Sequence, residues 1–212
     1  LMSSPVPAHQ RRPPVPSRPV AHAAQSAGYF RDQIVPIEAK HGRKIVVFEN
    51  DEFIRADTTE ESLSTLRPAF DKDGLVTAGN SSGINDGTAS VVLANSKTTE
   101  KHGANPLARV VSYGFGGVPP RIMGMGPVPA SKMALERASL TVDDLDVVES
   151  NEAFAAQACA VSKQLGLDPA IVNPNGGAIA LGHPVGATGA IIMTKLVDEL
   201  RRRDGRYGMA TM

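Results

Sequence analysis

Residues 173–189 read Asn173-Pro174-Asn175-Gly176-Gly177-Ala178-Ile179-Ala180-Leu181-Gly182-His183-Pro184-Val185-Gly186-Ala187-Thr188-Gly189. Five glycines and two prolines predict a loop here, because glycine lets backbone approach a ligand closely and proline fixes φ. The imidazole of His183 is attached directly before a proline, on a restrained backbone. Imidazole titrates near neutral pH and therefore suits general acid–base catalysis. A lone histidine between glycines is more often a turn residue than a catalytic one, so other parts of the sequence are needed to distinguish the two.

The composition is that of a globular protein without a charged or apolar specialisation. The 212 residues carry 22 basic and 22 acidic side chains, which gives no argument for nucleic acid or an acidic membrane as a partner. No apolar run approaches the roughly 20 residues needed to span a bilayer. The single cysteine, Cys159, excludes an internal disulfide and fits a reducing compartment. We expect a cytoplasmic protein, with the mitochondrion and the peroxisome as alternatives.

Residues 1–19 differ from the rest of the chain. They hold six of the 16 prolines, three arginines and no acidic residue. No apolar core of a secretory signal follows, and the prolines oppose an amphipathic transit helix. We expect a disordered or non-native tail that takes no part in the fold.

Helix-like and strand-like segments alternate through the remainder, which predicts an α/β sheet with buried central strands. Helices are expected at residues 23–27, 60–66, 131–139 (capped by Ser131), 151–165 and 185–203. Strands are expected at 34–38, 45–48, 109–113, 146–150, 171–174 and 206–212, and a buried strand or helix start at 88–94. Ligands collect at the carboxyl ends of strands in such sheets, and both Asn151 and His183 follow a predicted strand.

Two further stretches accompany the histidine loop. Residues 76–87 read Val-Thr-Ala-Gly-Asn-Ser-Ser-Gly-Ile-Asn-Asp-Gly, and residues 151–157 read Asn-Glu-Ala-Phe-Ala-Ala-Gln. In this order and spacing the three stretches resemble the C-terminal part of the thiolase family, close to the acetyl-CoA acetyltransferases. Shorter matches at 66–72 and 126–130 extend the resemblance over about residues 20–212.

The resemblance implies a thiolase-like α/β fold: a C-terminal domain with a mixed sheet flanked by helices, plus part of the loop domain. Residues 20–82 would be a remnant of the loop domain. Residues 83–105 would be a strand and helix segment that normally completes the N-terminal domain. Residues 106–212 would be the C-terminal domain without its last strands.

Thiolases join or cleave acyl groups on coenzyme A, which is a substrate, and no further cofactor is implied. By resemblance, His183 activates a nucleophilic cysteine and contributes to the oxyanion hole, where Asn151 holds a water. Residues matching contacts to the nucleotide end of coenzyme A are Arg55 and Ser62. Residues matching the pantetheine wall and acyl pocket are Ala78, Gly79, Ser82, Ile84, Phe154 and Met123. Without the resemblance, Arg55 would be interpreted as a surface arginine and Gly79 and Ser82 as turn residues. Asn151 would be interpreted as a helix N-cap and Phe154 as a core residue.

Neither cysteine of the family pattern is matched. The nucleophile would lie in an N-terminal half, and the acid–base cysteine would follow the strand at 206–212. Cys159 lies within a predicted helix, where we expect a small buried hydrophobe.

We therefore expect a fragment without turnover of its own. Its partners would be an acyl-CoA and the missing N-terminal half, and the full-length form would be a homo-oligomer. The fragment should expose apolar surface, including an unpaired edge near residues 88–94. Two alternatives stay open: a degradative 3-ketoacyl-CoA thiolase, and a non-catalytic module that binds coenzyme A or serves assembly.

Overall fold

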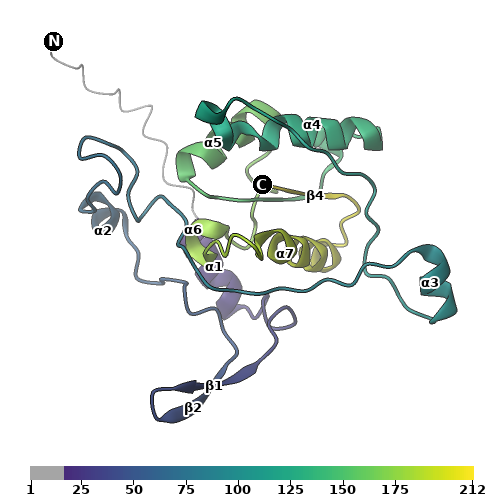
Figure 1. Ribbon diagram of the computed structural model, residues 1–212, viewed down its shortest axis with the longest axis horizontal. Helices are drawn as coiled ribbons and strands as arrows, with labels where there is room; N and C mark the ends of the chain where they lie inside the picture. The colour runs from purple at the N-terminus through teal and green to yellow at the C-terminus, as the bar shows by residue number, and fades with distance from the viewer. Residues whose placement is uncertain (1–16) are drawn as a thin grey trace.

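The computed structural model describes residues 17–212 (Figure 1). Its helices are α1 (Ser17–Ser26), α2 (Glu60–Ser64), α3 (Ser96–Lys101), α4 (Pro127–Ala138), α5 (Ala155–Leu165), α6 (Ala178–Leu181) and α7 (Thr188–Arg203), with 3₁₀ turns η2 (Pro120–Met125) and η3 (Val142–Asp144). Its strands are β1 (Ile37–His41), β2 (Lys44–Phe48), β3 (Val147–Ser150) and β4 (Gly208–Thr211).

Two parallel strands form the centre of the α/β part. β3 and β4 pair in parallel from Val147 opposite Gly208 to Ser150 opposite Thr211. Val172 adds a single parallel bridge to Val148, on the other edge of β3. Within the described residues this sheet contains parallel pairings only. Helices cover both of its faces, with α4 and α5 on one side and α7 on the other (Figure 1).

Side chains alternate between these two faces, as they must along a strand. Val148 of β3 belongs to the apolar cluster shared with α4 and α5. Val147 and Glu149 therefore point to the opposite face, toward α7. The buried members of the apolar cluster are Val128, Leu145, Val148, Val161, Leu165, Leu167 and Met209.

Helix α7 can approach the sheet closely because β4 begins with a glycine. A Cβ on Gly208 would lie 2.6 Å from Leu196 Cδ1, which real side chains do not tolerate. Leu196 and Ile192 are both buried on this side of the helix. Three arginines in the last turn of α7 complement the helix dipole, as the sequence indicates.

The first third of the described chain lies around this centre. Helix α1 packs against α6, and Ala21 and Ala24 of α1 are buried. β1 and β2 form an antiparallel hairpin that projects outward, and α2 and α3 lie on separate excursions of the chain (Figure 1). No helix of residues 17–212 is both long and apolar enough to cross a membrane.

Three predicted strands are wrong. Residues 171–174 form only one isolated bridge, from Val172 to Val148. Residues 88–94 and 109–113 are extended but irregular, and they pair with no strand among residues 17–212. Val92 and Leu93 are 94% and 79% exposed, so this segment is not buried. The β-branched residues of segments 88–94 and 109–113 favour a strand only where a neighbouring strand offers cross-strand contacts. The expected exposure of apolar surface is thereby confirmed.

Several predicted boundaries are also wrong. Residues 17–19 belong to α1 rather than to the tail, whose other residues lie outside the described part. The first hairpin strand begins after Pro36, which lacks an N–H, and its turn is confined to Gly42 and Arg43. Helix α4 begins at Pro127, because proline fits the first helical position. Ser131 is therefore inside the helix and buried, and its hydroxyl hydrogen-bonds Thr211 Oγ1 at 2.9 Å.

Helix α5 begins later than predicted, and this affects two residues. Its N-cap is Phe154, so Asn151 lies outside the helix and is not its cap. Cys159 is exposed rather than buried. The buried residues of α5 are Ala158, Val161 and Leu165, and Cys159 is rotated by about 100° from Ala158 around the helix axis.

Candidate functional site

Three loops meet at the carboxyl end of β3. Ser82 N–H donates to Ala153 O at 3.0 Å, and Ala155 N–H donates to Asn80 O at 2.9 Å. His183 N–H donates to Gly83 O at 3.2 Å. These backbone bonds hold the loop around Ser82 between the segment after β3 and the histidine loop. The three stretches quoted from the sequence are thus brought together.

Asn151 and His183 face each other at this junction. Asn151 Nδ2 lies 3.4 Å from His183 Nε2, and Asn151 is only 7% exposed. Its other polar atom, Oδ1, is buried and hydrogen-bonds to none of residues 17–212. A buried carbonyl oxygen of this kind requires a donor, so the pair leaves one acceptor available beside the imidazole.

Thr188 determines which nitrogen of His183 carries the proton. Thr188 Oγ1 lies 3.0 Å from Pro184 O, a carbonyl that can only accept, so the hydroxyl donates there. Its lone pairs remain for His183 Nδ1, 2.7 Å away, which must then be the N–H donor. In the neutral ring Nε2 consequently carries a lone pair. The nitrogen that faces Asn151 is therefore the basic one.

Replacing Thr188 by valine should change this tautomer. Valine keeps the shape but removes the acceptor for Nδ1–H, so we expect Nε2–H to become the major neutral form. Two-dimensional ¹⁵N–¹H NMR of the imidazole distinguishes the two tautomers directly. Thr188→Ser, which retains the hydroxyl, is the control, and an unchanged tautomer in Thr188→Val would refute the assignment.

Buried polar side chains connect the histidine loop to β3 and to the segment after it. Asn173, at φ 46°, accepts from Ser150 N and donates to Ser150 O, both at 2.8 Å, and so continues the edge of β3. Glu152 is fully buried; it accepts from Asn173 Nδ2 at 2.9 Å and from Ile179 N–H at 3.2 Å at the start of α6. Neither role was predicted from the sequence. The signal available was a carboxylate between Asn151 and two apolar residues.

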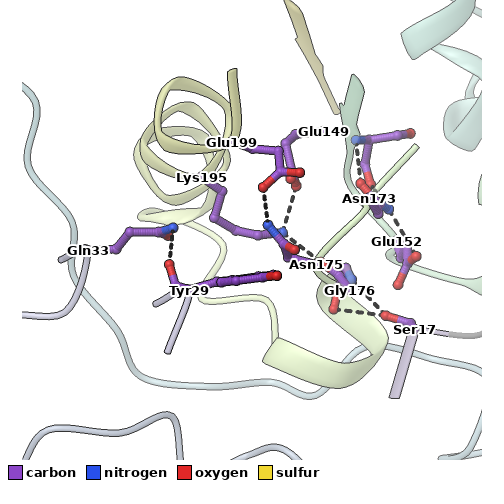
Figure 2. Close-up of polar contacts among 12 residues, drawn as sticks. Ser17, Tyr29, Gln33, Glu149, Glu152, Asn173, Asn175, Gly176, Lys195 and Glu199 are labelled. Carbon is purple, nitrogen blue, oxygen red and sulfur yellow. Dashed lines mark hydrogen bonds and ion pairs between the residues drawn. The ribbon is translucent and has the colours of Figure 1, made fainter. Parts of the chain in front are cut away.

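A buried ion pair lies on the α7 side of the same loop (Figure 2). Lys195 Nζ contacts Glu149 Oε2 and Gly176 O, each at 2.6 Å, and both side chains are almost fully buried. Burial raises the pKa of the Glu149 carboxyl, and the Lys195 charge opposes that rise. Lys195 thus joins β3, α7 and the glycine pair of the histidine loop.

A second buried carboxylate, Glu199, lies on α7 one helical turn after Lys195. Glu199 is 1% exposed and accepts from Asn175 Nδ2 at 2.7 Å (Figure 2). Arg202 and Arg203 also donate to Glu199. Burial works to raise the pKa of Glu199, but the hydrogen bonds from Arg202, Asn175 and Arg203 outweigh it and lower the pKa.

The residues matched to the nucleotide end of coenzyme A lie around α2. Arg55 is exposed on the loop before α2. Ser62 closes the capping box of α2, its hydroxyl accepting from Thr59 N–H at 3.0 Å. Gly79 is buried against this helix, since a Cβ there would meet Leu63 Cδ2 at 2.6 Å.

The residues matched to the pantetheine wall and acyl pocket are less uniformly placed. Ser82 is half-buried beside Ala153, and Phe154 is half-buried with its ring 6.3 Å edge-on from that of Phe70. Ala78 is exposed. Ile84 and Met123 are 101% and 75% exposed, so the described residues do not enclose them in a pocket.

A shallow depression of about 330 Å³ adjoins the histidine loop. Its walls are residues 85–89 and 184–187. Asn85 connects the two walls by accepting from His183 N–H at 3.3 Å. Among residues 17–212, no three His, Cys, Asp or Glu side chains gather as a metal site would require. The site offers an oriented imidazole, the amide of Asn151 and a shallow depression beside the histidine loop.

Comparison with known proteins identifies the family. Residues 104–212 match the family described as thiolase, C-terminal domain, and residues 10–97 match thiolase, N-terminal domain. The chain belongs to the thiolase family. The resemblance of the three sequence stretches to thiolases is thus confirmed.

Several individual thiolases are similar over most of the chain. The beta-ketothiolase BktB of Cupriavidus necator is 59% identical over 193 residues, which are 91% of this chain and 49% of that protein. The acetyl-CoA acetyltransferase of Bacillus anthracis superposes with a TM-score of 0.88 at 52% identity, over 92% of this chain and 49% of its own. Human mitochondrial 3-ketoacyl-CoA thiolase in complex with CoA gives 0.85 at 47% identity, over 93% and 50%. The α/β thiolase fold is confirmed, and the chain spans about half the length of these relatives.

Proposed function

We propose that this chain supplies the histidine, asparagine and coenzyme A-binding part of a thiolase-type acyltransferase. The reaction is the condensation of two acetyl-CoA into acetoacetyl-CoA and free CoA, or its reverse. The observation that carries the proposal is the oriented pair of Asn151 and His183. The Nε2 lone pair can take the proton of a cysteine thiol, since a thiol is a poor nucleophile until it is deprotonated.

The same pair suits the stabilisation of an oxyanion. Once Nε2 is protonated, it can donate to the oxygen of the thioester as negative charge develops there. The buried Oδ1 of Asn151 can hold a water as the second donor. Each such fixed donor lowers the barrier by about 3–4 kcal/mol in well-studied cases.

Coenzyme A binding extends the proposal along the loops described above. Arg55 and Ser62 are assigned to its nucleotide end, Ala78, Gly79, Ser82, Ile84 and Phe154 to pantetheine, and Met123 to the acyl group. The division into residues 20–82, 83–105 and 106–212 rests on the same resemblance to thiolases and stays a prediction. A cytoplasmic location and a homo-oligomeric full-length form stay predictions.

The nucleophile is not supplied by the cysteine of this sequence. Cys159 is exposed on α5 and is absent from the hydrogen-bonded group around His183. We therefore propose that the 212-residue chain has no turnover alone and requires the remaining half of a thiolase. A degradative 3-ketoacyl-CoA thiolase stays the alternative, because the human enzyme of that name is also similar to this chain. The two proposals differ in the length of the acyl chain that the enzyme accepts.

A chimera tests the catalytic roles. The parts of the C. necator relative that this chain does not match are fused to it, and acetoacetyl-CoA thiolysis is measured. We expect activity in the chimera, none in the 212-residue chain, and a fall of about 10²–10³ in kcat for His183→Asn and for Asn151→Ala. His102→Asn replaces an exposed histidine and should leave kcat unchanged.

Three outcomes would contradict the proposal. An inactive but folded chimera that still binds coenzyme A would favour the non-catalytic module. Undiminished activity in His183→Asn would remove the histidine from the chemistry. Thiolysis by the 212-residue chain would refute its dependence on a second half.

A further inference from the structure

Arg18 connects the loop at Thr58 with the loop at Ala78, which are 20 residues apart in the sequence. Its Nη1 donates to Thr58 Oγ1 and its Nη2 donates to Ala78 O, each at 3.3 Å. The Thr58 hydroxyl in turn donates to Arg55 O at 3.2 Å. One guanidinium in the first turn of α1 thus links the loop before α2 to the loop at Ala78.

Arg18 and Arg55 bring two positive charges to this junction. Burial and, to a smaller extent, the nearby charge of Arg55 lower the pKa of Arg18. No carboxylate of residues 17–212 forms an ion pair with either arginine. The positive charges of Arg18 and Arg55 repel each other, and a multivalent anion bound by both would offset that repulsion.

We infer that Arg18, together with Arg55, binds a phosphate group at the nucleotide end of coenzyme A. This inference rests on the proposed coenzyme A site. The guanidinium contacts Ala78 O, which is assigned to the pantetheine wall, and Thr58 Oγ1, on the loop of Arg55, which is assigned to the nucleotide end. It therefore lies between these two assigned parts of the coenzyme A site. Guanidinium groups present paired N–H donors that match phosphate oxygens.

The position of Arg18 is fixed relative to the histidine loop. The neighbouring Ser17 hydroxyl accepts from Gly177 N–H at 2.7 Å and contacts Gly177 O at 3.3 Å (Figure 2). Ala21 packs on Gly176, so the next turn of α1 is held as well. A single short helix thereby sets the separation between the phosphate anchor and His183, which the extended pantetheine arm has to span.

Calorimetric titration of the 212-residue chain with CoA, 3′,5′-ADP and pantetheine tests the inference. We expect Arg18→Gln to weaken CoA and 3′,5′-ADP binding by about 10-fold or more, because charge-assisted hydrogen bonds are lost, and to leave pantetheine binding unchanged. Arg18→Lys keeps the charge and should lose less. Arg43→Gln removes an exposed arginine at the hairpin turn and serves as the charge-matched control.

The outcomes separate this inference from the proposed function. Equal CoA affinity in Arg18→Gln and wild type would overturn the role of Arg18 while leaving the coenzyme A site in place. Failure of wild type to bind either CoA or pantetheine would overturn both. If Arg18→Gln unfolds, Arg18→Lys and the salt dependence of 3′,5′-ADP binding to wild type decide, since binding that is insensitive to salt also overturns the inference.

Discussion

Replacing Lys195 by methionine is expected to lower the free energy of unfolding by about 3–5 kcal/mol. The substitution preserves most of the apolar stem but leaves the Glu149 carboxylate buried without its cation. It also removes the donor to Gly176 O, 2.6 Å from Nζ in the native chain. Equilibrium urea unfolding followed by circular dichroism measures the loss, and hydrogen exchange of the β3 amides reports it locally.

The pH dependence of this loss has a definite sign. Burial raises the folded-state pKa of Glu149, and removing Lys195 raises it further, so the folded variant holds a proton that the unfolded chain releases. The stability deficit relative to the native chain should therefore be smallest at acid pH. It should grow as the pH rises above the folded-state pKa of Glu149 in the native chain, which itself lies above the ordinary glutamate value. Adding Glu149→Gln should recover part of the loss.

The matched control for Lys195 is Lys163→Met. Lys163 is an exposed residue of α5, so its substitution should change stability by less than about 0.5 kcal/mol. A Lys195→Met variant as stable as this control would show that the ion pair does not hold the loop.

Replacing Gly176 by alanine is expected to cost about 2–5 kcal/mol. Gly176 has φ +84°, a conformation that costs an L-residue about 1–2 kcal/mol. Its new Cβ would also lie 2.6 Å from Ala21 Cβ and 2.8 Å from Ser17 O, which adds an overpacking cost of about 1–3 kcal/mol. Urea unfolding again provides the measurement.

Gly166 separates the two contributions. It has φ +73°, but a Cβ there would meet no heavy atom within 4 Å. Gly166→Ala should therefore show the conformational cost alone. Equal losses in the two alanine variants would mean that the contact between α1 and the histidine loop is not tight.

The site was more predictable from the sequence than the fold around it. The loops of Ser82, Asn151 and His183 lie together as their shared resemblance to thiolases led us to expect, because long literal stretches carry that resemblance. The catalytic and binding roles of these residues stay predictions. Lys195 was not found, because a lysine within an apolar helix stripe is ordinarily read as an exposed residue. Its partner, Glu149, lies far away in the sequence, and only the pairing of α7 with β3 shows that the two charges meet.

The wrong strands have a different physical origin. Residues 88–94 and 109–113 have strand-forming composition, but composition does not supply a neighbouring strand. Helices satisfy their own backbone groups, which is why residues 60–64 and 188–203 were predicted within a few positions. The prediction that Ser131 caps a helix was wrong for a local reason: Pro127 fits the first helical position, so α4 begins four residues before Ser131.

The hydroxyl of Thr188 makes the tautomer of His183 depend on whether the first turn of α7 is formed. That hydroxyl can direct its proton to Pro184 O only while the first turn of α7 is closed. If the turn opens, the same hydroxyl can donate to Nδ1, and the lone pair facing Asn151 is exchanged for an N–H. Fraying at one helix end would thus change a proton acceptor into a donor without moving the ring.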